Sequence, residues 1–519
     1  MRSTLPFRLV LVVLAAAATL SACGGDDPVR PPGGGGIPQG RPFLDPAYRP
    51  SGRAAAGDVF VHLFEWKWGD VATECETVLG PAGVRAVQVS PPQEHARIQS
   101  FPWWQRYQPV SYQLEGRSGT SAEFADMVSR CAEAGVGVYV DAVINHMTAG
   151  DGVGSAGTAY TKYSYPGLWD APDFHPGCGV SDYQSAANVQ DCELLGLADL
   201  NTGRAEVRQR LAEYLIGLVD LGVAGFRIDA AKHIQPVELD SIVDLVNEAA
   251  LAHGHAAPYF FGEVIDYGGE AVRIRDYFGL GYSSGGSADL TEFRFRGVRD
   301  AFTGSNGQSL SSLGSFSPVA WGLIPSDKAV VFIENHDTQR DGGALTAARG
   351  AAYRFAHLWL LAQPYGYPKI MSSYAFAFRD QGPPASGTGE TLDVLCPVDP
   401  EEVNPGEWVC EHRDPGILAM VGFRQATAGT TVEGWWDNGG DAIAFSRGGR
   451  GFVVLNLEAS TVSVNVQSGL PEGRYCDILE GGVAAGGCSG GEITVAADGG
   501  IQIEVAARTA VAIHVGARP

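Results

Sequence analysis

Three carboxylates, Asp229, Glu263 and Asp337, each stand at the C-terminal end of a short run of mostly apolar residues. Runs of this length and composition are typical of buried β-strands. In a barrel of parallel strands, catalytic residues collect at the C-terminal ends of the strands. Acids at three such ends therefore indicate a catalytic site that works with carboxylates.

The first of these runs, residues 225–233, carries charge on one of its faces. Phe226 and Ile228 point one way, and Arg227 and Asp229 point the other way, with the period of two that is typical of a strand. A structural ion pair between Arg227 and Asp229 would also explain this pattern, because buried charges need partners. The two interpretations are compatible, because an arginine one pleat away would keep a catalytic aspartate ionised.

The elements that must position these acids alternate between strand and helix from residue 59 onward. A helix is predicted at 70–79, and another opens with a capping box formed by Thr120 and Glu123. Eight such βα units predict an α/β fold, a (β/α)₈ TIM barrel; a doubly wound sheet is the alternative. The eight strands are predicted at residues 59–64, 84–89, 136–143, 225–229, 259–263, 288–293, 329–337 and 368–373.

Two regions break this alternation. Residues 147–199 are rich in Gly, Ser, Tyr and Pro and are too long for an ordinary loop, so we expect an irregular inserted domain. Residues 431–519 contain short β-rich segments between Gly-rich turns, which predict a C-terminal all-β sandwich. The barrel is then expected to comprise residues 57–146 and 200–430.

The N-terminus has the features of an export signal. Its apolar segment at 9–20 follows two arginines and is too short to span a bilayer comfortably. The segment ends in Leu-Ser-Ala-Cys, which looks like a bacterial lipoprotein cleavage box. We therefore expect residues 1–22 to be removed and Cys23 to be lipidated; secretion with a spare cysteine is the alternative. Residues 23–56 are predicted to be a Gly/Pro-rich tether.

The composition of the chain limits the kinds of molecule that it is expected to bind. The chain has 36 basic and 59 acidic residues and a formal net charge of −23, which argues against binding to nucleic acid or to anionic lipid surfaces. A neutral polymer substrate is compatible with this charge. Nine cysteines leave an even set of eight when Cys23 is set aside, and an even set in an exported chain suggests disulfides. Eight cysteines allow 105 pairings, so spacing alone assigns none of them.

Several motifs in order resemble those of the α-amylases, in the superfamily of retaining glycoside hydrolases built on a (β/α)₈ barrel. The similarity is greatest to the animal-type, chloride-dependent α-amylases and extends from residue 59 to the C-terminus. It implies a catalytic barrel, a domain inserted after the third strand and a C-terminal sandwich. The motifs are residues 62–66, 87–92, 103–112, 141–146, 225–233, 263–266, 335–337 and 371–374.

The resemblance implies that Asp229 is the nucleophile, Glu263 the general acid/base, and Asp337 a third carboxylate that orients the substrate. Retaining hydrolysis needs one carboxylate to attack the anomeric carbon and another, about 5–5.5 Å away, to protonate the leaving oxygen. The expected reaction is endo-hydrolysis of α-1,4-glucosidic bonds in starch, glycogen and related oligosaccharides. A glucan transglycosylase using the same site, or a non-catalytic starch-binding surface lipoprotein, are the alternatives.

Substrate contacts are also implied by the resemblance. Trp103, Trp104 and Tyr107 match aromatic platforms for glucose rings; we expect them in an exposed loop, although core packing would also explain them. The other implied contacts are Arg227, the histidines His146, His233 and His336 and, matched more loosely, Gln108, Tyr183, Lys232, Ile265 and Glu270.

The resemblance implies a calcium ion between the barrel and the inserted domain. Its ligands would be the side chains of Asn145 and Asp199 and the main-chain carbonyls of Gln190 and His233. Oxygen ligands alone suit a hard cation such as calcium.

A chloride ion is implied at Arg227, Asn335 and Lys369. Animal enzymes usually carry arginine at the last of these positions, and an ammonium offers a point charge in place of a bidentate fork, so weaker binding is expected. A bound chloride would offset the pull of Arg227 and Lys369 on Glu263 and help that acid to keep its proton.

The resemblance also implies the pairing of the cysteines: Cys75–Cys131, Cys178–Cys192, Cys396–Cys410 and Cys476–Cys488. A further bridge of the animal enzymes is absent, because Glu115 and Thr148 occupy its positions. The loop after Asp337 is also cut short, at 341–343. We expect a monomer that acts on an α-glucan, exported to the cell surface or outer membrane by its lipid anchor, or secreted.

Overall fold

The computed structural model describes residue 44 and residues 47–341, 345–397 and 403–519. The predicted signal segment, Cys23, most of the predicted tether and part of the shortened loop at 341–343 lie outside these ranges. Within the described ranges, no helix is both long and apolar enough to cross a membrane.

The last residues of the predicted tether are bound to the barrel, which corrects the boundary expected at residue 56. The Tyr48 hydroxyl donates to the Asp327 carboxylate at 3.1 Å, and the Ser51 hydroxyl donates to Asp289 at 2.6 Å. Residues Arg53–Ala56 form the short helix α1. These polar side chains find partners on the barrel, so the segment from Tyr48 onward is part of the folded domain.

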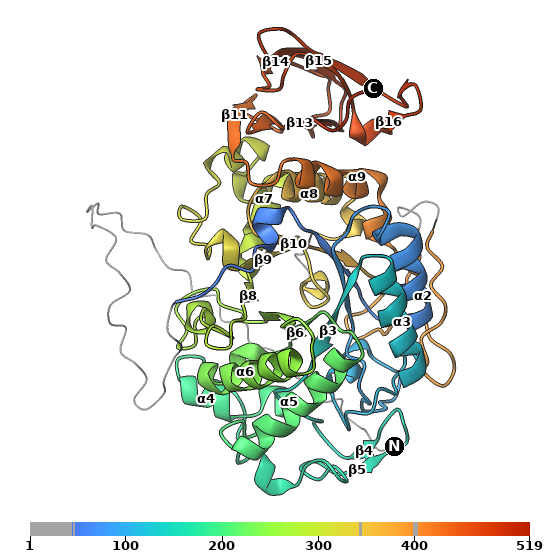
Figure 1. Cartoon of the computed structure of the whole chain (residues 1–519), viewed down its shortest axis with the longest axis vertical. Coiled ribbons are helices and arrows are strands. Elements are labelled where there is room, and N and C mark those ends of the chain that lie inside the picture. The colour runs from blue at the N-terminus through green and yellow to red at the C-terminus, as the bar shows by residue number, and fades with distance from the viewer. Residues whose placement is uncertain (1–43, 45–46, 342–344, 398–402) are drawn as a thin grey trace, which may run out of the picture. The chain divides into compact units, whose positions relative to one another are not determined.

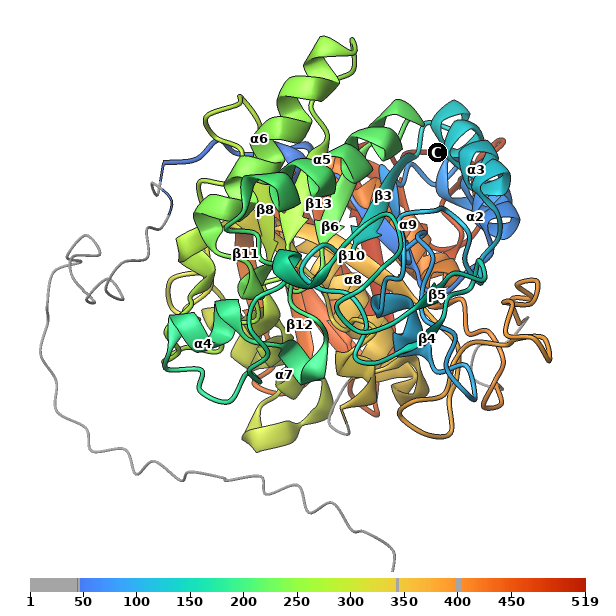
Figure 2. The same ribbon diagram turned by 90° about the horizontal axis from the view of Figure 1, so that it is seen from below.

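Eight parallel strands close into a barrel in the order β1-β10-β9-β8-β7-β6-β3-β2, which confirms the predicted (β/α)₈ fold. Figures 1 and 2 show the strands at the centre of the helices that surround them. The barrel strands are β1 (Phe60–Leu63), β2 (Ala86–Val89), β3 (Gly137–Ala142), β6 (Gly225–Ile228), β7 (Tyr259–Gly262), β8 (Ala288–Thr291), β9 (Ala329–Val331) and β10 (Tyr367–Ser372).

Most outer helices bury one face against the strands, whereas the helix Ala351–Ala362 is buried on all sides from Phe355 onward. The predicted capping box is present: Thr120 accepts from the backbone N–H of Glu123, and the Glu123 carboxylate accepts from the backbone N–H of Thr120. The helix predicted at 70–79 starts earlier and changes its winding to a π-helical turn at Cys75–Leu79. The helices are α2 (Trp68–Glu74), α3 (Ser121–Glu133), α5 (Ala205–Asp220), α6 (Pro236–Ala252), α7 (Arg299–Thr303), α8 (Ala351–Ala362) and α9 (Pro415–Ala426).

The barrel interior is layered because strand side chains alternate between inside and outside. Aromatic residues dominate the lower layer, where they form a buried cluster of their own: Phe60, Ala86, Tyr139, Tyr259, Phe261, Val330 and Tyr367. Two positions beyond Phe60, Ala86, Tyr139, Gly225, Phe261 and Tyr367 lies a polar layer nearer the C-terminal ends of the strands: His62, Gln88, Asp141, Arg227, Glu263 and Lys369. The aromatic floor therefore closes the barrel below the candidate active site.

The inserted region and the sandwich follow the predicted order. Between β3 and α5 the chain holds α4 (Ala186–Asp191) and two short strands, β4 (Gly152–Val153) and β5 (Ala159–Tyr160). All four predicted disulfides are confirmed. The sandwich has the sheet β11-β12-β13-β20 and smaller antiparallel pairs around a common apolar core. Its strands are β11 (Val432–Asp437), β12 (Ala442–Arg447), β13 (Gly451–Asn456), β14 (Val462–Gln467), β15 (Gly473–Cys476), β16 (Val483–Ala484), β17 (Gly487–Cys488), β18 (Glu492–Val495), β19 (Gly500–Val505) and β20 (Thr509–His514).

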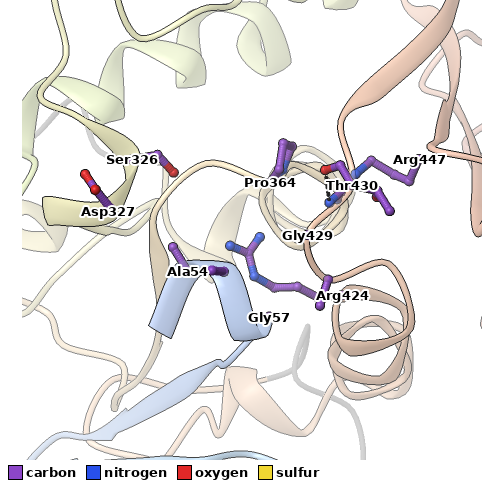
Figure 3. Close-up of a pocket in the computed structure, with 11 residues that line it drawn as sticks. Ala54, Gly57, Ser326, Asp327, Pro364, Arg424, Gly429, Thr430 and Arg447 are labelled. Atoms are coloured by element: carbon purple, nitrogen blue, oxygen red, sulfur yellow. Dashed lines mark hydrogen bonds between the residues drawn. The ribbon is translucent and has the colours of Figure 1, made fainter. Parts of the chain in front are cut away.

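Two buried arginines line a cavity of about 300 Å³ where the sandwich meets the barrel helices (Figure 3). Arg424 on α9 donates to the carbonyls of Gln363 and, at 2.5 Å, Gly366. Arg447 on β12 donates to Ala362 at the end of α8 and to Thr427 and Thr430 after α9, at 3.1 and 3.0 Å for the last two. The sandwich is thus tied to two helix C-termini of the barrel.

Candidate active site

Arg227 joins the proposed nucleophile to the proposed acid. Its Nη1 lies 2.9 Å from Asp229 Oδ1 and 2.5 Å from Asp141 Oδ1, while its Nη2 lies 2.5 Å from Glu263 Oε1. The Glu263 contact lacks the alignment of a hydrogen bond, so Nη2 has no hydrogen-bond partner among the described residues. Asp229 and Glu263 are therefore held side by side on the two terminal nitrogens of one buried guanidinium.

A left-handed residue directly after Asp229 fixes the second oxygen of Glu263. Ala230 has φ 48° and ψ 32°, although only glycine adopts this region freely. In this conformation its backbone N–H donates to Glu263 Oε2 at 3.1 Å. The local backbone of the nucleophile strand thus orients the acid on the neighbouring strand.

Acidic side chains outnumber basic side chains around Arg227. Asp141, Asp229, Glu263 and Asp337 gather around one guanidinium. Burial, with added repulsion from other acids, raises the pKa of Asp229 well above its ordinary value. Like charges at this spacing oppose the ionisation of one another, so these carboxyl groups titrate as a coupled set.

This charge balance corrects one expectation. Arg227 was expected to keep Asp229 ionised, and it does lower the pKa of that carboxyl. Burial is the larger effect, and Glu263 and Asp141 add to it, so the net direction is upward. An arginine shared by three carboxylates cannot offset the burial of each of them.

Asp337 lies beside a stack of rings. Its side chain keeps 43% of its surface exposed, and its Oδ2 lies 3.3 Å from Nε2 of the buried His336. The His336 ring stacks on Tyr107 and on Phe64, both with centroids 5.1 Å apart. The Tyr107 hydroxyl in turn donates to Asp141 Oδ2 at 2.9 Å. This stack connects the third carboxylate to the acids around Arg227.

The aromatic residues predicted in an exposed loop form a short 3₁₀ helix, Trp103–Tyr107, and two of them are buried. Trp103 is 8% exposed and Tyr107 is 9% exposed, so the predicted exposure is wrong for both. Trp103 donates its indole N–H to the Arg379 carbonyl at 3.0 Å and packs against Phe64. Trp104 is more open than either. Core packing, the alternative explanation, therefore accounts for much of this motif.

The other two predicted histidines are buried and neutral. Nε2 of His146 donates to the Tyr107 carbonyl at 2.9 Å, and Nδ1 of His233 donates to the Val189 carbonyl at 2.8 Å. Burial lowers the pKa of each ring to about 4. At neutral pH they therefore act as polar, uncharged groups that also connect the barrel to neighbouring loops.

The more loosely matched residues fall into two places. Lys232 donates to the Ile265 carbonyl at 2.6 Å, pairs with Glu270, and lies over the Tyr183 ring at 5.1 Å. These four residues thus form one contact group between the inserted domain and the loop after β7. Gln108 lies elsewhere, where its side-chain oxygen accepts from the backbone N–H of Ala149 at 3.1 Å.

The predicted calcium ligands come together in two pairs. A β-bridge between His146 and Asp199, with the backbone N–H of Leu200 donating to the Asn145 carbonyl at 3.0 Å, brings Asn145 beside Asp199. The bond from His233 to Val189 brings the loop after β6 to the residue before Gln190.

The buried Asp199 is the observation that fits a cation. One of its oxygens binds His175 at 2.7 Å, while Oδ1 has no partner within the described ranges. Burial raises the pKa of this carboxyl to about 7. The described residues contain no cluster of three or more His, Cys, Asp or Glu side chains arranged for a metal, so carbonyl and amide oxygens must complete any site here.

The predicted chloride residues supply positive charge and free N–H groups. Lys369 is 1% exposed, and burial, followed by the nearby Arg227, lowers its pKa to about 7. Nη2 of Arg227 and both ring nitrogens of His62 have no hydrogen-bond partner in the described part of the chain. Asn335 holds its own loop by accepting from the Thr338 N–H at 2.8 Å. An unpartnered guanidinium N–H group beside a second buried cation fits a small anion.

Comparison with known proteins gives the family. The chain is 45% identical to an α-amylase of Tribolium castaneum over 479 residues, which is 90% of this chain and 95% of the relative. The chain belongs to the α-amylase family. An α-amylase of Tenebrio molitor is 43% identical over 477 residues, 90% of this chain and 98% of that protein.

The α-amylase assignment extends over both folded parts. The α-amylase catalytic domain matches residues 83–255, and the α-amylase C-terminal all-β domain matches residues 435–516. The crystal structure of α-amylase I from Eisenia fetida aligns with a TM-score of 0.80 and 38% identity, covering 91% of this chain and 99% of that one. This protein is thus an α-amylase that is similar to α-amylases of animals.

Three residues near the candidate active site were not predicted from the sequence as site residues: Asp141, His62 and Arg340. Asp141 shares Arg227 with Asp229, and His62 lies in the same polar layer. Arg340 donates to the His336 carbonyl at 2.7 Å and to the Tyr374 hydroxyl at 2.9 Å. A polar residue two positions beyond an inward-facing aromatic, as in β1 and β3, is the signal that would have identified the first two.

Proposed function

We propose that this enzyme hydrolyses internal α-1,4-glucosidic bonds of starch, glycogen and related oligosaccharides with retention of anomeric configuration. The single observation that carries the proposal is the shared guanidinium, because Arg227 holds Asp229 and Glu263 side by side. Two neighbouring carboxylates are what double displacement needs, whereas inversion needs room for a water between them. A variant of the Eisenia fetida α-amylase is described in complex with maltohexaose, which supports an α-glucan substrate.

In the proposed mechanism, an Asp229 oxygen attacks the anomeric carbon while the bond to the leaving oxygen breaks. Glu263 gives its proton to that oxygen. Glu263, now ionised, then takes a proton from water, which attacks the same carbon and releases Asp229. Asp337, beside the neutral His336, would hold hydroxyl groups of the distorted sugar.

Two ions are part of the proposal. Asn145, Asp199 and the carbonyls of Gln190 and His233 would hold calcium and fasten the inserted domain to the barrel. Arg227, Asn335 and Lys369 would hold chloride. The direct contact of Arg227 with Glu263 supports a role for that anion, because a chloride bound to Arg227 would lie next to the proposed acid.

Export is proposed from the N-terminal motif alone. We expect removal of residues 1–22, lipidation of Cys23, and a monomer held at the cell surface or outer membrane, or secreted. Replacement of Cys23 by Ala should move activity from the membrane fraction to the soluble fraction. Activity that stays in the membrane fraction would contradict the lipid anchor.

The test of the activity is release of reducing ends from soluble starch, with products separated by length and their anomeric form followed by NMR. Internal cleavage with α-configured products is expected. Products longer than the substrate would favour transglycosylation. Binding to starch without any new reducing ends would contradict the proposal and favour a binding protein.

A further inference from the structure

Tyr267 lies four residues beyond Glu263, in the loop after β7, and it is 48% exposed. The residue before it fixes this loop. The buried Asp266 carboxylate accepts from the backbone N–H groups of Gly268 at 2.7 Å and Ile274 at 3.1 Å, and Arg294 donates to the Asp266 carbonyl at 2.9 Å. Tyr267 is therefore presented outward from a rigid turn.

One face of the Tyr267 ring is covered by a cation. The guanidinium carbon of Arg296 lies 4.7 Å from the ring centroid. Since the side chain nevertheless keeps almost half of its surface open, that surface lies on the remaining face and edge. A cation–π contact attracts the guanidinium to the ring face and so favours one orientation of the ring. An oriented ring with a free face is the group that stacks on a pyranose.

Tyr267 lies three residues before Glu270, one of the substrate contacts that the resemblance implies. Burial is the main cause that raises the pKa of its hydroxyl; Asp341 and Glu270 add to this rise, whereas Arg296 and Arg299 oppose it. Glu270 pairs with Lys232 next to Tyr183, and the backbone N–H of Ala271 donates to the Tyr183 carbonyl at 2.9 Å. Tyr267 thus lies close to Glu270 and to the segment that follows Asp337.

We infer that Tyr267 is a stacking platform for the sugar chain on the leaving-group side of the bond that is cut. The inference rests on the proposed function and adds a specificity-determining residue to it. Glu263 donates its proton to the leaving oxygen, so the loop that continues from Glu263 borders the departing chain. A sugar held there improves binding of long substrates and keeps an acceptor close to the intermediate, which favours transfer over hydrolysis.

A half-exposed tyrosine is ordinary on a protein surface, and the chain supplies a matched control. Tyr282 is 40% exposed and has the Arg49 guanidinium 4.7 Å from its ring centroid. It lies in the segment that leads into β8, beside Ser283 and Ser284, which bond to the second half of α6. Tyr282 therefore repeats the local chemistry of Tyr267 at the opposite end of the barrel.

The experiment compares Tyr267→Ala, Tyr267→Phe and Tyr282→Ala with the unmodified enzyme. kcat/KM is measured on maltoheptaose and on an aryl maltotrioside, whose leaving group carries no sugar, and transfer products are counted at high substrate. We expect Tyr267→Ala to lose about three- to tenfold on maltoheptaose, less than twofold on the aryl substrate, and much of its transfer, in line with one aromatic contact. Tyr267→Phe should keep most of the activity, and Tyr282→Ala all of it.

Equal behaviour of Tyr267→Ala and Tyr282→Ala on both substrates, at equal melting temperatures, would overturn the inference. So would an equal loss on the two substrates, because that result indicates damage to the catalytic centre. Failure of the proposed function would appear separately, as absence of reducing-end release by the unmodified enzyme.

Discussion

Two of the places where the described residues bury guanidinium groups differ in the kind of partner that they provide. At the barrel mouth, Arg227 contacts three carboxylates, and these raise its pKa. At the junction with the sandwich, Arg424 and Arg447 bond only to main-chain carbonyls among the described residues. Burial there lowers the pKa of Arg424 to about 9 and that of Arg447 to about 10.

This difference in partners distinguishes the candidate active site at Arg227 from the structural contacts at Arg424 and Arg447. Carboxylates around Arg227 can share protons with each other, so their charge could move during the proposed reaction. Carbonyls at the ends of helices carry fixed partial charges that satisfy a cation and nothing more. Changes at the mouth should therefore alter rates, whereas changes at the junction should alter stability.

The largest expected effect is at the mouth. Glu263→Gln keeps the size of the side chain but removes the proton donor, which should cost on the order of 10²–10⁴-fold in kcat/KM. Asp229→Asn should be at least as severe, since no covalent intermediate can form. Hydrolysis of maltoheptaose and circular dichroism of the same samples check this. Rates near those of the unmodified enzyme, from a folded variant, would refute the assigned roles.

Substitution of Arg447, at the junction between the sandwich and the barrel, should lower stability and leave activity unchanged. Arg447→Met leaves the carbonyls of Ala362, Thr427 and Thr430 without their donor, which should cost about 3 kcal/mol of unfolding free energy and lower the melting temperature by several degrees. Activity per folded molecule should not change. Arg450→Met, at an exposed position of the same domain, is the control. An activity loss without a change in melting would reverse the comparison.

Chelation tests a third kind of structural contact, the proposed calcium ion bound to Asp199. Calcium present at about a hundred times its dissociation constant would add about 2.7 kcal/mol, so a chelator should lower the melting temperature and open residues 147–199 to proteases first. The pKa of Asp199 is about 7 and the cation needs the ionised carboxylate, so affinity should fall as pH drops below 7. Asp199→Asn should be indifferent to the chelator; a chelator effect in that variant would place the ion elsewhere.

The smallest effect concerns Lys369. Chloride needs its ammonium form, whose pKa is about 7, so the half-activating concentration should rise by up to about tenfold per pH unit above 7. Lys369→Arg stays charged and should abolish this rise and lower the requirement a few-fold. Without chloride, the basic limb of the pH–rate profile should move to lower pH. Identical profiles in chloride and in a non-binding anion, at equal ionic strength, would refute the anion site.

The fold could be predicted from the sequence where local signals and barrel geometry agree. Thr120 and Glu123 define a helix start by their own chemistry, and eight separate apolar runs leave few arrangements besides a barrel. The π-helical turn at Cys75–Leu79 could not be predicted, because a change of helical winding has no distinct residue pattern. The start of the folded domain was missed because Tyr48 and Ser51 find their partners only in three dimensions.

The sequence predicted which residues form the candidate active site, but it did not predict the contacts between them. Motif positions gave Asp229, Glu263 and Asp337, whereas the direct contact between Arg227 and Glu263 depends on how β6 and β7 are placed side by side. The burial of Tyr107 against His336 likewise depends on a tertiary contact. Sequence patterns state which way a side chain faces, and packing decides what it meets.

Ala230 limits how this enzyme can vary over evolutionary time. Its left-handed backbone excludes β-branched and bulky residues, which adopt that conformation at high cost. Asparagine and aspartate tolerate the conformation, but an aspartate would bring a fifth carboxylate to a crowded group. Glycine fits, yet it loosens the segment that aims the acid. Few amino acids therefore preserve both the left-handed backbone at Ala230 and the charge of the neighbouring acids. We expect residue 230 to be substituted more slowly in evolution than the buried apolar residues around it.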